Sequence, residues 1–262
     1  MTDASILKQL ELAKAQGRKK LAVLIDPDKV RLQNMQRLLE LSVEVGVNYF
    51  FIGGSLIVNN MLDRVLEEIK ERCHIPMILF PGNTFQLSYR ADAILFLSLI
   101  SGRNADLLIG NHVIAAPYLR LSPLEVLPTG YVLIDGGKQT TVSYMSNTRP
   151  IPADKEDIAV CTAMAGEMLG LRLMYLDAGS GAHTPVSEAM IASVAGAISI
   201  PLIVGGGIRS PEKVQADLAA GADLVVVGNA LESDPELLRE MAAVVQGFAP
   251  SVHSDSSNNH PH

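Results

Sequence analysis

Cysteine is scarce in this chain, with only Cys73 and Cys161 among 262 residues. The two lie far apart, and neither has a second cysteine or a histidine beside it at the spacing of zinc ligands. We therefore expect neither a disulfide nor a zinc site. Residues 1–20 are typical of a short amphipathic helix ending in basic residues, without the apolar stretch and cleavage site of a secretion signal. A cytoplasmic location is expected.

Long apolar runs and an excess of basic charge are also absent. The nearest candidate for a membrane span, residues 93–100, is far too short. The formal net charge of −7 gives no general field that attracts nucleic acid or anionic lipid. The sequence contains no Gly-x-x-x-x-Gly-Lys-Ser/Thr loop and no basic stripe with interleaved aromatics. We expect small-molecule partners, no nucleic acid and no membrane span.

The pattern that is present predicts a single α/β domain. The composition is 48% hydrophobic and 19% charged, as in globular proteins, and the length suits one (β/α)8 TIM barrel. Short β-rich runs alternate with amphipathic helical patterns, as in repeated βαβ units. The runs are 21–25, 49–52, 77–80, 93–97, 131–134, 172–176, 202–204 and 224–227. We predict a barrel over residues 1–250 and a disordered tail over 251–262, with metal binding by His253, His260 and His262 as the alternative for the tail.

Two connections depart from the regular repeat. Residues 81–88 are too few and too rich in turn formers for a covering helix, so the third helix is expected to be shortened or missing and the wall open there. Residues 144–152 form a polar, proline-bearing segment after the fifth run. A loop of that length is more often functional or mobile than a simple connection.

Glycine-rich turns follow the seventh and eighth runs. They are Gly205-Gly206-Gly207 and Gly228-Asn229, each at the start of a helical pattern. Glycine lets the backbone approach an anion closely, while the first N–H groups of the following helix point at it. TIM barrels commonly bind phosphate with these two loops, so we predict a phosphate clamp. The alternative is tight packing of each strand against its helix.

Polar groups suited to a metal ion follow the first two runs. Asp26, Asp28 and Lys29 come after the first, and Ser55 comes after the second, behind Gly53-Gly54. Mg²⁺ prefers one or two carboxylates, with water and substrate phosphates completing its shell. For both segments the alternative interpretation is capping of the next helix.

The loop after the sixth run is the most elaborate. Tyr175-Leu176-Asp177-Ala178-Gly179-Ser180-Gly181-Ala182 could supply a hydroxyl, a general base and backbone donors together. Alternatively, Asp177 caps a helix or accepts a structural hydrogen bond. Of the histidines, His183 lies beside this loop and merits a test, whereas His74 and His112 fall in helical patterns and are expected on the surface or in packing.

Together these segments resemble the geranylgeranylglyceryl phosphate synthase family, in the family's order from the first predicted strand to the last helix. The matching motifs are Leu24-Ile25-Asp26-Pro27-Asp28-Lys29, Phe51-Ile52-Gly53-Gly54-Ser55, Phe80-Pro81-Gly82-Asn83, the segment 175–182, Val204-Gly205-Gly206-Gly207-Ile208-Arg209-Ser210 and Gly228-Asn229. The resemblance implies a TIM barrel without its third helix. It also implies Mg²⁺-dependent transfer of a polyprenyl group, geranylgeranyl or longer, from a diphosphate to the 3-hydroxyl of sn-glycerol 1-phosphate, and assembly into a dimer or hexamer.

The resemblance further assigns roles to residues. Asp26 and Ser55 would hold the Mg²⁺, with Asp28 nearby, while Tyr175 and Asp177 would be catalytic. The family pattern has Glu where this chain has Asp177, so either the loop moves inward, or water carries the hydroxyl proton and Asp177 orients the hydroxyl. The substrates would contact Tyr175, Leu176, Asp177, Ala178, Gly179, Ser180, Gly181, Gly205, Gly206, Gly228, Asn229 and Lys29.

The prenyl chain is expected in an apolar groove along residues 91–100 and 113–118. Two other interpretations remain. One is a different phosphate-binding barrel, such as a thiamin phosphate or indole-glycerol phosphate synthase, against which the Asp26-Pro27-Asp28 and 175–182 motifs argue. The other is a barrel that binds phosphorylated metabolites without catalysis, which the shortened acid at position 177 makes conceivable.

Overall fold

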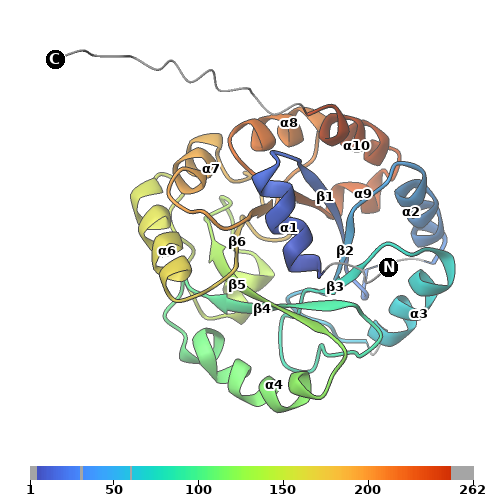
Figure 1. Cartoon of the computed structure of the whole chain (residues 1–262), viewed down its shortest axis with the longest axis horizontal. Helices are drawn as coiled ribbons and strands as arrows, with labels where there is room; N and C mark the ends of the chain where they lie inside the picture. Colours follow the sequence, from blue (N-terminus) through green and yellow to red (C-terminus); the bar gives the residue numbers. More distant parts are fainter. Residues whose placement is uncertain (1–4, 30–31, 60, 249–262) are drawn as a thin grey trace.

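The protein folds around a closed barrel of parallel strands. The computed structural model describes residues 5–29, 32–59 and 61–248, so the predicted tail lies outside the described residues. The eight strands follow one another around the barrel in sequence order, and β8 pairs with β1 (Figure 1). They are β1 Lys20–Ile25, β2 Tyr49–Ile52, β3 Met77–Leu79, β4 Ala93–Leu99, β5 Glu125–Leu133, β6 Leu173–Asp177, β7 Leu202–Gly205 and β8 Leu224–Val227. The predicted TIM barrel is confirmed.

The fifth strand begins earlier than the predicted 131–134. Pro128 and Gly130 are poor strand formers, and the sequence pattern therefore breaks there. In the structure, β5 pairs with the whole of β4, from Glu125 opposite Ala93 to Tyr131 opposite Leu99. Tertiary pairing thus overrides local propensity. β6 likewise lies one residue later than predicted and ends at Asp177.

Strand side chains alternate between the barrel interior and the layer beneath the helices. On β6, Leu173 and Tyr175 belong to the interior cluster, whereas Met174 and Leu176 pack with helical side chains. The same alternation turns Asp177 toward the interior, where it lines a cavity.

Helices cover the outside of the barrel (Figure 1). The covering helices are α2 Leu32–Glu44, α3 Leu62–Arg72, α4 Asn111–Arg120, α6 Glu156–Met168, α7 Glu188–Ala195, α8 Pro211–Ala219 and α10 Leu237–Gly247. Three short helices, η1 Asp106–Gly110, α5 Thr141–Met145 and α9 Asn229–Ser233, instead contribute residues to a cavity at the carboxyl ends of the strands. Residues 80–92, between β3 and β4, contain no helix, which confirms the predicted missing helix. Within the described residues, no helix is both long and apolar enough to cross a membrane.

A further helix, α1 Ile6–Ala15, lies across the amino-terminal end of the barrel (Figure 1). Its Ile6 and Leu10 pack into the interior cluster. The Glu125 carboxylate accepts hydrogen bonds from Ser5 Oγ at 2.5 Å and from the backbone N–H of Ile6 at 2.7 Å. These bonds satisfy donors that the first turn of a helix otherwise leaves unpaired. The helix therefore covers this end of the barrel.

Two local predictions are corrected. The predicted loop 144–152 is shorter, because α5 includes its first two residues. A capping box starts α5: Thr140 Oγ1 accepts from Ser143 N–H at 3.4 Å, and Ser143 Oγ accepts from Thr140 N–H at 3.0 Å. His74 lies exposed just beyond α3 and is not helical.

One buried acid in the helical layer gives a prediction about stability. Asp217 on α8 is fully buried beside Lys213, at 2.7 Å, and burial raises its pKa to about 6. A raised native pKa means that the native state binds the proton more tightly, so this group's contribution to stability falls as pH rises from about 4 to about 6. The free energy of unfolding of Asp217→Asn, relative to that of the wild type, should therefore be on the order of 1–3 kcal/mol higher at pH 7.5 than at pH 4.5.

Urea denaturation of both proteins at the two pH values measures this difference. Exposed Asp154→Asn is the control and should show no such gain. An Asp217→Asn difference that is equal at both pH values would contradict the prediction.

Candidate active site

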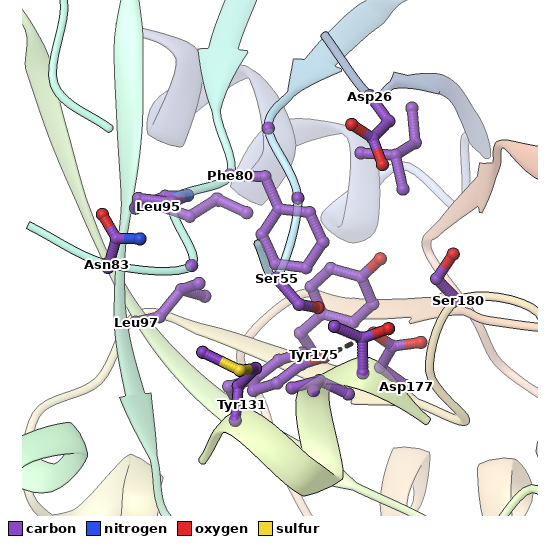
Figure 2. A pocket seen from close by; sticks show the side chains of 18 of the residues that line it. Asp26, Ser55, Phe80, Asn83, Leu95, Leu97, Tyr131, Tyr175, Asp177 and Ser180 are labelled. Carbon is purple, nitrogen blue, oxygen red and sulfur yellow. Dashed lines mark hydrogen bonds between the residues drawn. The ribbon is translucent and has the colours of Figure 1, made fainter. Parts of the chain in front are cut away.

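A cavity of about 580 Å³ opens where the carboxyl ends of the strands meet. Asp26 after β1, Ser55 after β2 and Gly206 after β7 all line it. Figure 2 shows Asp26 on one side and Asp177 and Ser180 on the other, with aromatic rings between them. The predicted metal region and the predicted phosphate region therefore face one common space.

Asp177 is the buried acid of this cavity, with 6% of its surface exposed. Tyr131 Oη donates a hydrogen bond to Asp177 Oδ2 at 2.5 Å, and the backbone N–H of Gly179 donates to Oδ1 at 2.7 Å (Figure 2 draws the first). Because each oxygen accepts one bond, the carboxylate is held in a single orientation. Tyr131 was not among the predicted site residues.

The ionisation of this group follows from burial. Burial raises the pKa of Asp177, while the hydrogen bonds from Tyr131 and Gly179 act in the opposite direction. Burial and the Asp177 charge raise the pKa of Tyr131 and of Tyr175 well above the usual phenol range. Both phenols are therefore protonated at neutral pH, and a carboxylate with a raised pKa is suited to accept a proton.

Aromatic rings fill the centre of the cavity between Asp26 and Asp177 (Figure 2). The Phe80 ring is stacked on Tyr175, with centroids 5.4 Å apart and planes at 22°. Tyr131 meets Tyr175 edge-on at 5.5 Å. These rings present apolar faces with negative electrostatic potential, which exclude water and attract positive charge.

The triple-glycine turn after β7 packs directly against the acid. Gly206 and Gly207 have φ values of 82° and 74°, a region that favours glycine. A Cβ on Gly206 would lie 2.4 Å from Asp177 Oδ1. A Cβ on Gly205 would lie 2.5 Å from Tyr175 Oη. Gly206 and Gly207 line the cavity, whereas Gly205 makes room for Tyr175 and does not line it.

The turn after β8 joins the same wall. Ser180 Oγ donates a hydrogen bond to Asn229 Oδ1 at 3.1 Å, which ties the loops after β6 and β8 together. Ser180, Gly181, Gly228 and Asn229 all line the cavity. The loops after β6, β7 and β8 thus meet at one wall, and the loops after the seventh and eighth strands are those with which TIM barrels frequently bind phosphate.

The opposite wall is polar and acidic. Asp26 Oδ2 lies 3.0 Å from Lys29 Nζ, and both residues line the cavity with Ser55. A Cβ on Gly54 would lie 3.2 Å from Asp26 Oδ2, so glycine leaves space beside the carboxylate. No group of three or more His, Cys, Asp or Glu side chains suited to a metal occurs in the described residues. One carboxylate and one hydroxyl fit Mg²⁺ only if phosphate oxygens and water complete its shell.

Asp28 was predicted to lie near the metal, but its environment differs from that of Asp26. Its carboxylate accepts the backbone N–H of Val58 at 2.5 Å and of Asn59 at 3.1 Å. Asp28 does not line the cavity. It organises the loop after β2, on which Ser55 also lies.

The predicted contact of the whole segment 175–181 with substrates is too broad. Leu176 and Ala178 pack into the layer between strands and helices, and neither lines the cavity. Gly179 is also outside the lining, and its N–H binds Asp177. The alternation of side chains that begins along β6 explains Leu176 and Ala178, whereas Gly179 faces the Asp177 carboxylate.

An apolar arm of the cavity runs from the aromatic rings toward α4. It is lined by Leu95, Leu97, Leu107, Ala115 and Leu119. The predicted segment 91–100 therefore contributes. In the predicted segment 113–118 only Ala115 faces the arm, because Val113, Ile114 and Tyr118 are 58–66% exposed on the other side of α4.

Of the three histidines that the structure describes, only His112 packs in the interior. His112 is buried, its Nε2 lies 3.1 Å from Ser98 Oγ, and its ring meets Phe96 edge-on at 4.4 Å. Burial lowers the pKa of His112, which favours the neutral ring. His112 also lines the apolar arm, whereas exposed His183 does not line the cavity.

Gln86, a further residue that the sequence did not single out, ties two loops of the cavity together. Its Oε1 accepts the N–H of Gly82 at 3.0 Å, and its Nε2 donates to the carbonyl of Gly54 at 2.9 Å. It lies in the irregular segment that replaces a helix, where no periodic pattern marks it.

Comparison with known proteins agrees with this geometry. Residues 15–247 match the model of the PcrB family. Two curated proteins are each named geranylgeranylglyceryl phosphate synthase. The one from Spirosoma linguale is 57% identical over 95% of this chain and 98% of its own length. The one from Chitinophaga pinensis is 56% identical over 90% of this chain and 94% of its own length. The crystal structure of (S)-3-O-geranylgeranylglyceryl phosphate synthase from Thermoplasma acidophilum, in complex with its substrate sn-glycerol-1-phosphate, has a TM-score of 0.87 at 33% identity, covering 93% of this chain and 99% of that one. The resemblance drawn from the six motifs is confirmed, and the chain belongs to the PcrB family, together with these geranylgeranylglyceryl phosphate synthases.

Proposed function

We propose that the protein is a prenyltransferase that joins a polyprenyl group, geranylgeranyl or longer, to the 3-hydroxyl of sn-glycerol 1-phosphate through an ether bond. One observation carries the proposal: a single cavity combines a glycine-rich anion cradle, a buried acid, an acidic pocket on the facing wall and an apolar arm. The names of the similar proteins, and the glycerol phosphate bound by the Thermoplasma acidophilum enzyme, support the same reaction.

The acceptor occupies the wall formed by β6, β7 and β8. Its phosphate binds the backbone of Gly206 and Gly228 and the side chains of Ser180 and Asn229, which line the cavity together. Its 3-hydroxyl then lies beside Asp177. Tyr131 keeps that carboxylate turned toward the cavity.

The donor's diphosphate occupies the facing wall, near Asp26, Ser55 and Lys29, and its hydrocarbon chain lies in the apolar arm. The acceptor oxygen forms a bond to C1 of the prenyl group while the bond from C1 to the diphosphate oxygen breaks, and that electron pair leaves with the diphosphate. The hydroxyl proton passes to Asp177, directly or through a water that Asp177 orients. The faces of Phe80 and Tyr175 stabilise the positive charge that develops on the allylic carbons.

Mg²⁺ is part of the proposal, with Asp26 and Ser55 as its protein ligands. When bound, it would neutralise charge on the departing diphosphate. Asp26→Asn should raise the Mg²⁺ concentration for half-maximal rate by about 10-fold or more, since the loss of even an outer-shell partner of a metal ligand typically costs about 10–100-fold in affinity or activity. Initial rates over a Mg²⁺ titration measure this.

The matched control for Asp26→Asn is Asp28→Asn, because Asp28 binds backbone N–H groups outside the cavity. It should leave the Mg²⁺ requirement near that of the wild type. Equal Mg²⁺ dependence in the Asp26 variant and the wild type would remove Asp26 from the metal site.

The proposal includes a homo-oligomer and a cytoplasmic location. Apolar side chains are exposed along η1 and α4, among them Ile109, Val113, Ile114 and Leu121, a surface that a second copy would cover. Light scattering after size exclusion measures the assembly. Cys73 and Cys161 are both free, which agrees with a reducing compartment.

A direct assay tests the function. Radiolabelled sn-glycerol 1-phosphate is incubated with prenyl diphosphates of graded length, with and without Mg²⁺, and the label is extracted into organic solvent. Label in the organic phase supports the proposal and identifies the donor length. Label that stays in water with every donor, although the protein binds glycerol phosphate, would favour a non-catalytic phosphometabolite-binding barrel.

A further inference from the structure

The loop after β5 holds a lysine that the site has not yet used. The loop is Asp135-Gly136-Gly137-Lys138. The carbonyl of Gly136 accepts the backbone N–H of His183 at 3.0 Å and of Thr184 at 3.1 Å. A Cβ on Gly136 would lie 2.6 Å from the Cβ of Ala182. The loop is thus packed tightly against the loop after β6, and this fixes the backbone from which Lys138 extends.

The ammonium group of Lys138 lies beside the anion cradle, although Lys138 itself is exposed and is not among the residues that line the cavity. Lys138 Nζ is 3.6 Å from the position that a Cβ on Gly181 would take, and Asn229 Nδ2 is also 3.6 Å from that position. Gly181 and Asn229 both line the cavity. Two nitrogen donors from different loops therefore converge on the same side of Gly181.

Two other cations, Lys29 and Arg209, line the cavity, and both form contacts within the protein. Lys29 pairs with Asp26 at 3.0 Å. The Arg209 guanidinium donates to the carbonyls of Ala182 at 2.5 Å and His183 at 3.3 Å, which holds the loop after β6 in place. Lys138 forms no ion pair within residues 5–29, 32–59 and 61–248.

We propose that Lys138 binds the phosphate of the acceptor. By doing so, it makes the enzyme bind glycerol phosphate more tightly than unphosphorylated glycerol. The proposal rests on the proposed function and deepens it. Backbone N–H groups supply geometry but no net charge, whereas a phosphate carries up to two negative charges at neutral pH. In a protein of net charge −7, a cation beside the cradle adds the positive charge that the backbone donors lack. A charge-assisted hydrogen bond from Lys138 supplies it.

Steady-state kinetics of Lys138→Ala test the proposal. The KM for sn-glycerol 1-phosphate should rise about 10-fold or more, the effect of losing one charged hydrogen bond. The kcat and the KM for the prenyl diphosphate should stay within about twofold of the wild type, because Lys138 touches neither the donor nor Asp177. Lys138→Arg, which keeps the charge, should recover most of the affinity, and Lys70→Ala, an exposed lysine on α3, should match the wild type.

A second readout separates phosphate binding from a merely structural effect. Inorganic phosphate should inhibit the wild type in competition with the acceptor, and Lys138→Ala should weaken that inhibition about 10-fold, the same loss of one charged hydrogen bond. If the wild type turns over but Lys138→Ala keeps its KM for the acceptor and its phosphate inhibition, the assignment of Lys138 is wrong. If the wild type forms no ether product with any donor, the proposed function itself fails.

Discussion

Asp177→Asn is expected to lower kcat by about 100-fold or more, the usual contribution of a positioned general base. The amide keeps the shape of the side chain but cannot accept the hydroxyl proton. The acceptor phosphate is held by other residues, so calorimetry should give nearly unchanged affinity for sn-glycerol 1-phosphate. Unchanged turnover would remove Asp177 from catalysis, whereas loss of binding would make it a substrate-holding residue.

The pH profile adds an independent test of the same group. Asp177 must be ionised to accept a proton, so the rate should fall as pH falls through its pKa. Because burial raises that pKa, the acid limb of kcat should lie above the range of an ordinary carboxylate. Tyr131→Phe removes a hydrogen bond that lowers the pKa of Asp177, so the acid limb should move to still higher pH. An acid limb that is the same in this variant would show that Tyr131 does not control Asp177.

Gly206→Ala is expected to have the second large effect, a loss of kcat/KM for the acceptor of about 100-fold or more, the cost of misplacing a site by about 1 Å. At φ 82° a side chain is strained, and the new Cβ would lie 2.4 Å from Asp177 Oδ1 and 2.7 Å from the backbone nitrogens of Ala178 and Gly179. The turn after β7 must therefore move away from the acid loop. Kinetics with the acceptor varied, together with a thermal melt, measure the effect.

Gly170→Ala is the matched control for this substitution. Gly170 also has a positive φ, 91°, but a Cβ there would meet nothing within 4 Å. It therefore carries the same backbone strain, about 1 kcal/mol, without displacing a neighbour. If both variants lose activity equally, strain alone is the cause and the cradle geometry is not. A folded Gly206→Ala protein with normal kinetics would also contradict the prediction.

The sequence predicted the glycine turns and the acids because these residues follow strands, and a parallel barrel brings all strand ends to one face. Tyr131 lies in the predicted run 131–134, but nothing in the sequence distinguishes it as a site residue from the other strand residues that face the barrel interior. Only the register between β5 and β6 places Tyr131 opposite Tyr175 and within hydrogen-bond distance of Asp177.

Other residues show a second limit of sequence patterns. Asp26 and Asp28 are two positions apart and chemically alike, yet Asp26 lines the cavity while Asp28 binds the backbone of the next loop. Lys138 follows a polar loop with no motif, and its position depends on packing against the loop after β6. Contacts between loops from different strands are set by tertiary structure, which local patterns do not encode.

The position of α1 over the amino-terminal end affects the side from which substrates reach the cavity. Ile6 and Leu10 pack into the interior cluster at that end, whereas the cavity lies at the opposite end, where the carboxyl ends of the strands meet. In the proposed reaction, both reactants would enter, and both the diphosphate and the ether lipid would leave, at the carboxyl end of the barrel, where the cavity lies. Substitutions on α1 should therefore change the half-life of the folded barrel at high temperature, while the activity of the folded protein at the carboxyl end stays unchanged.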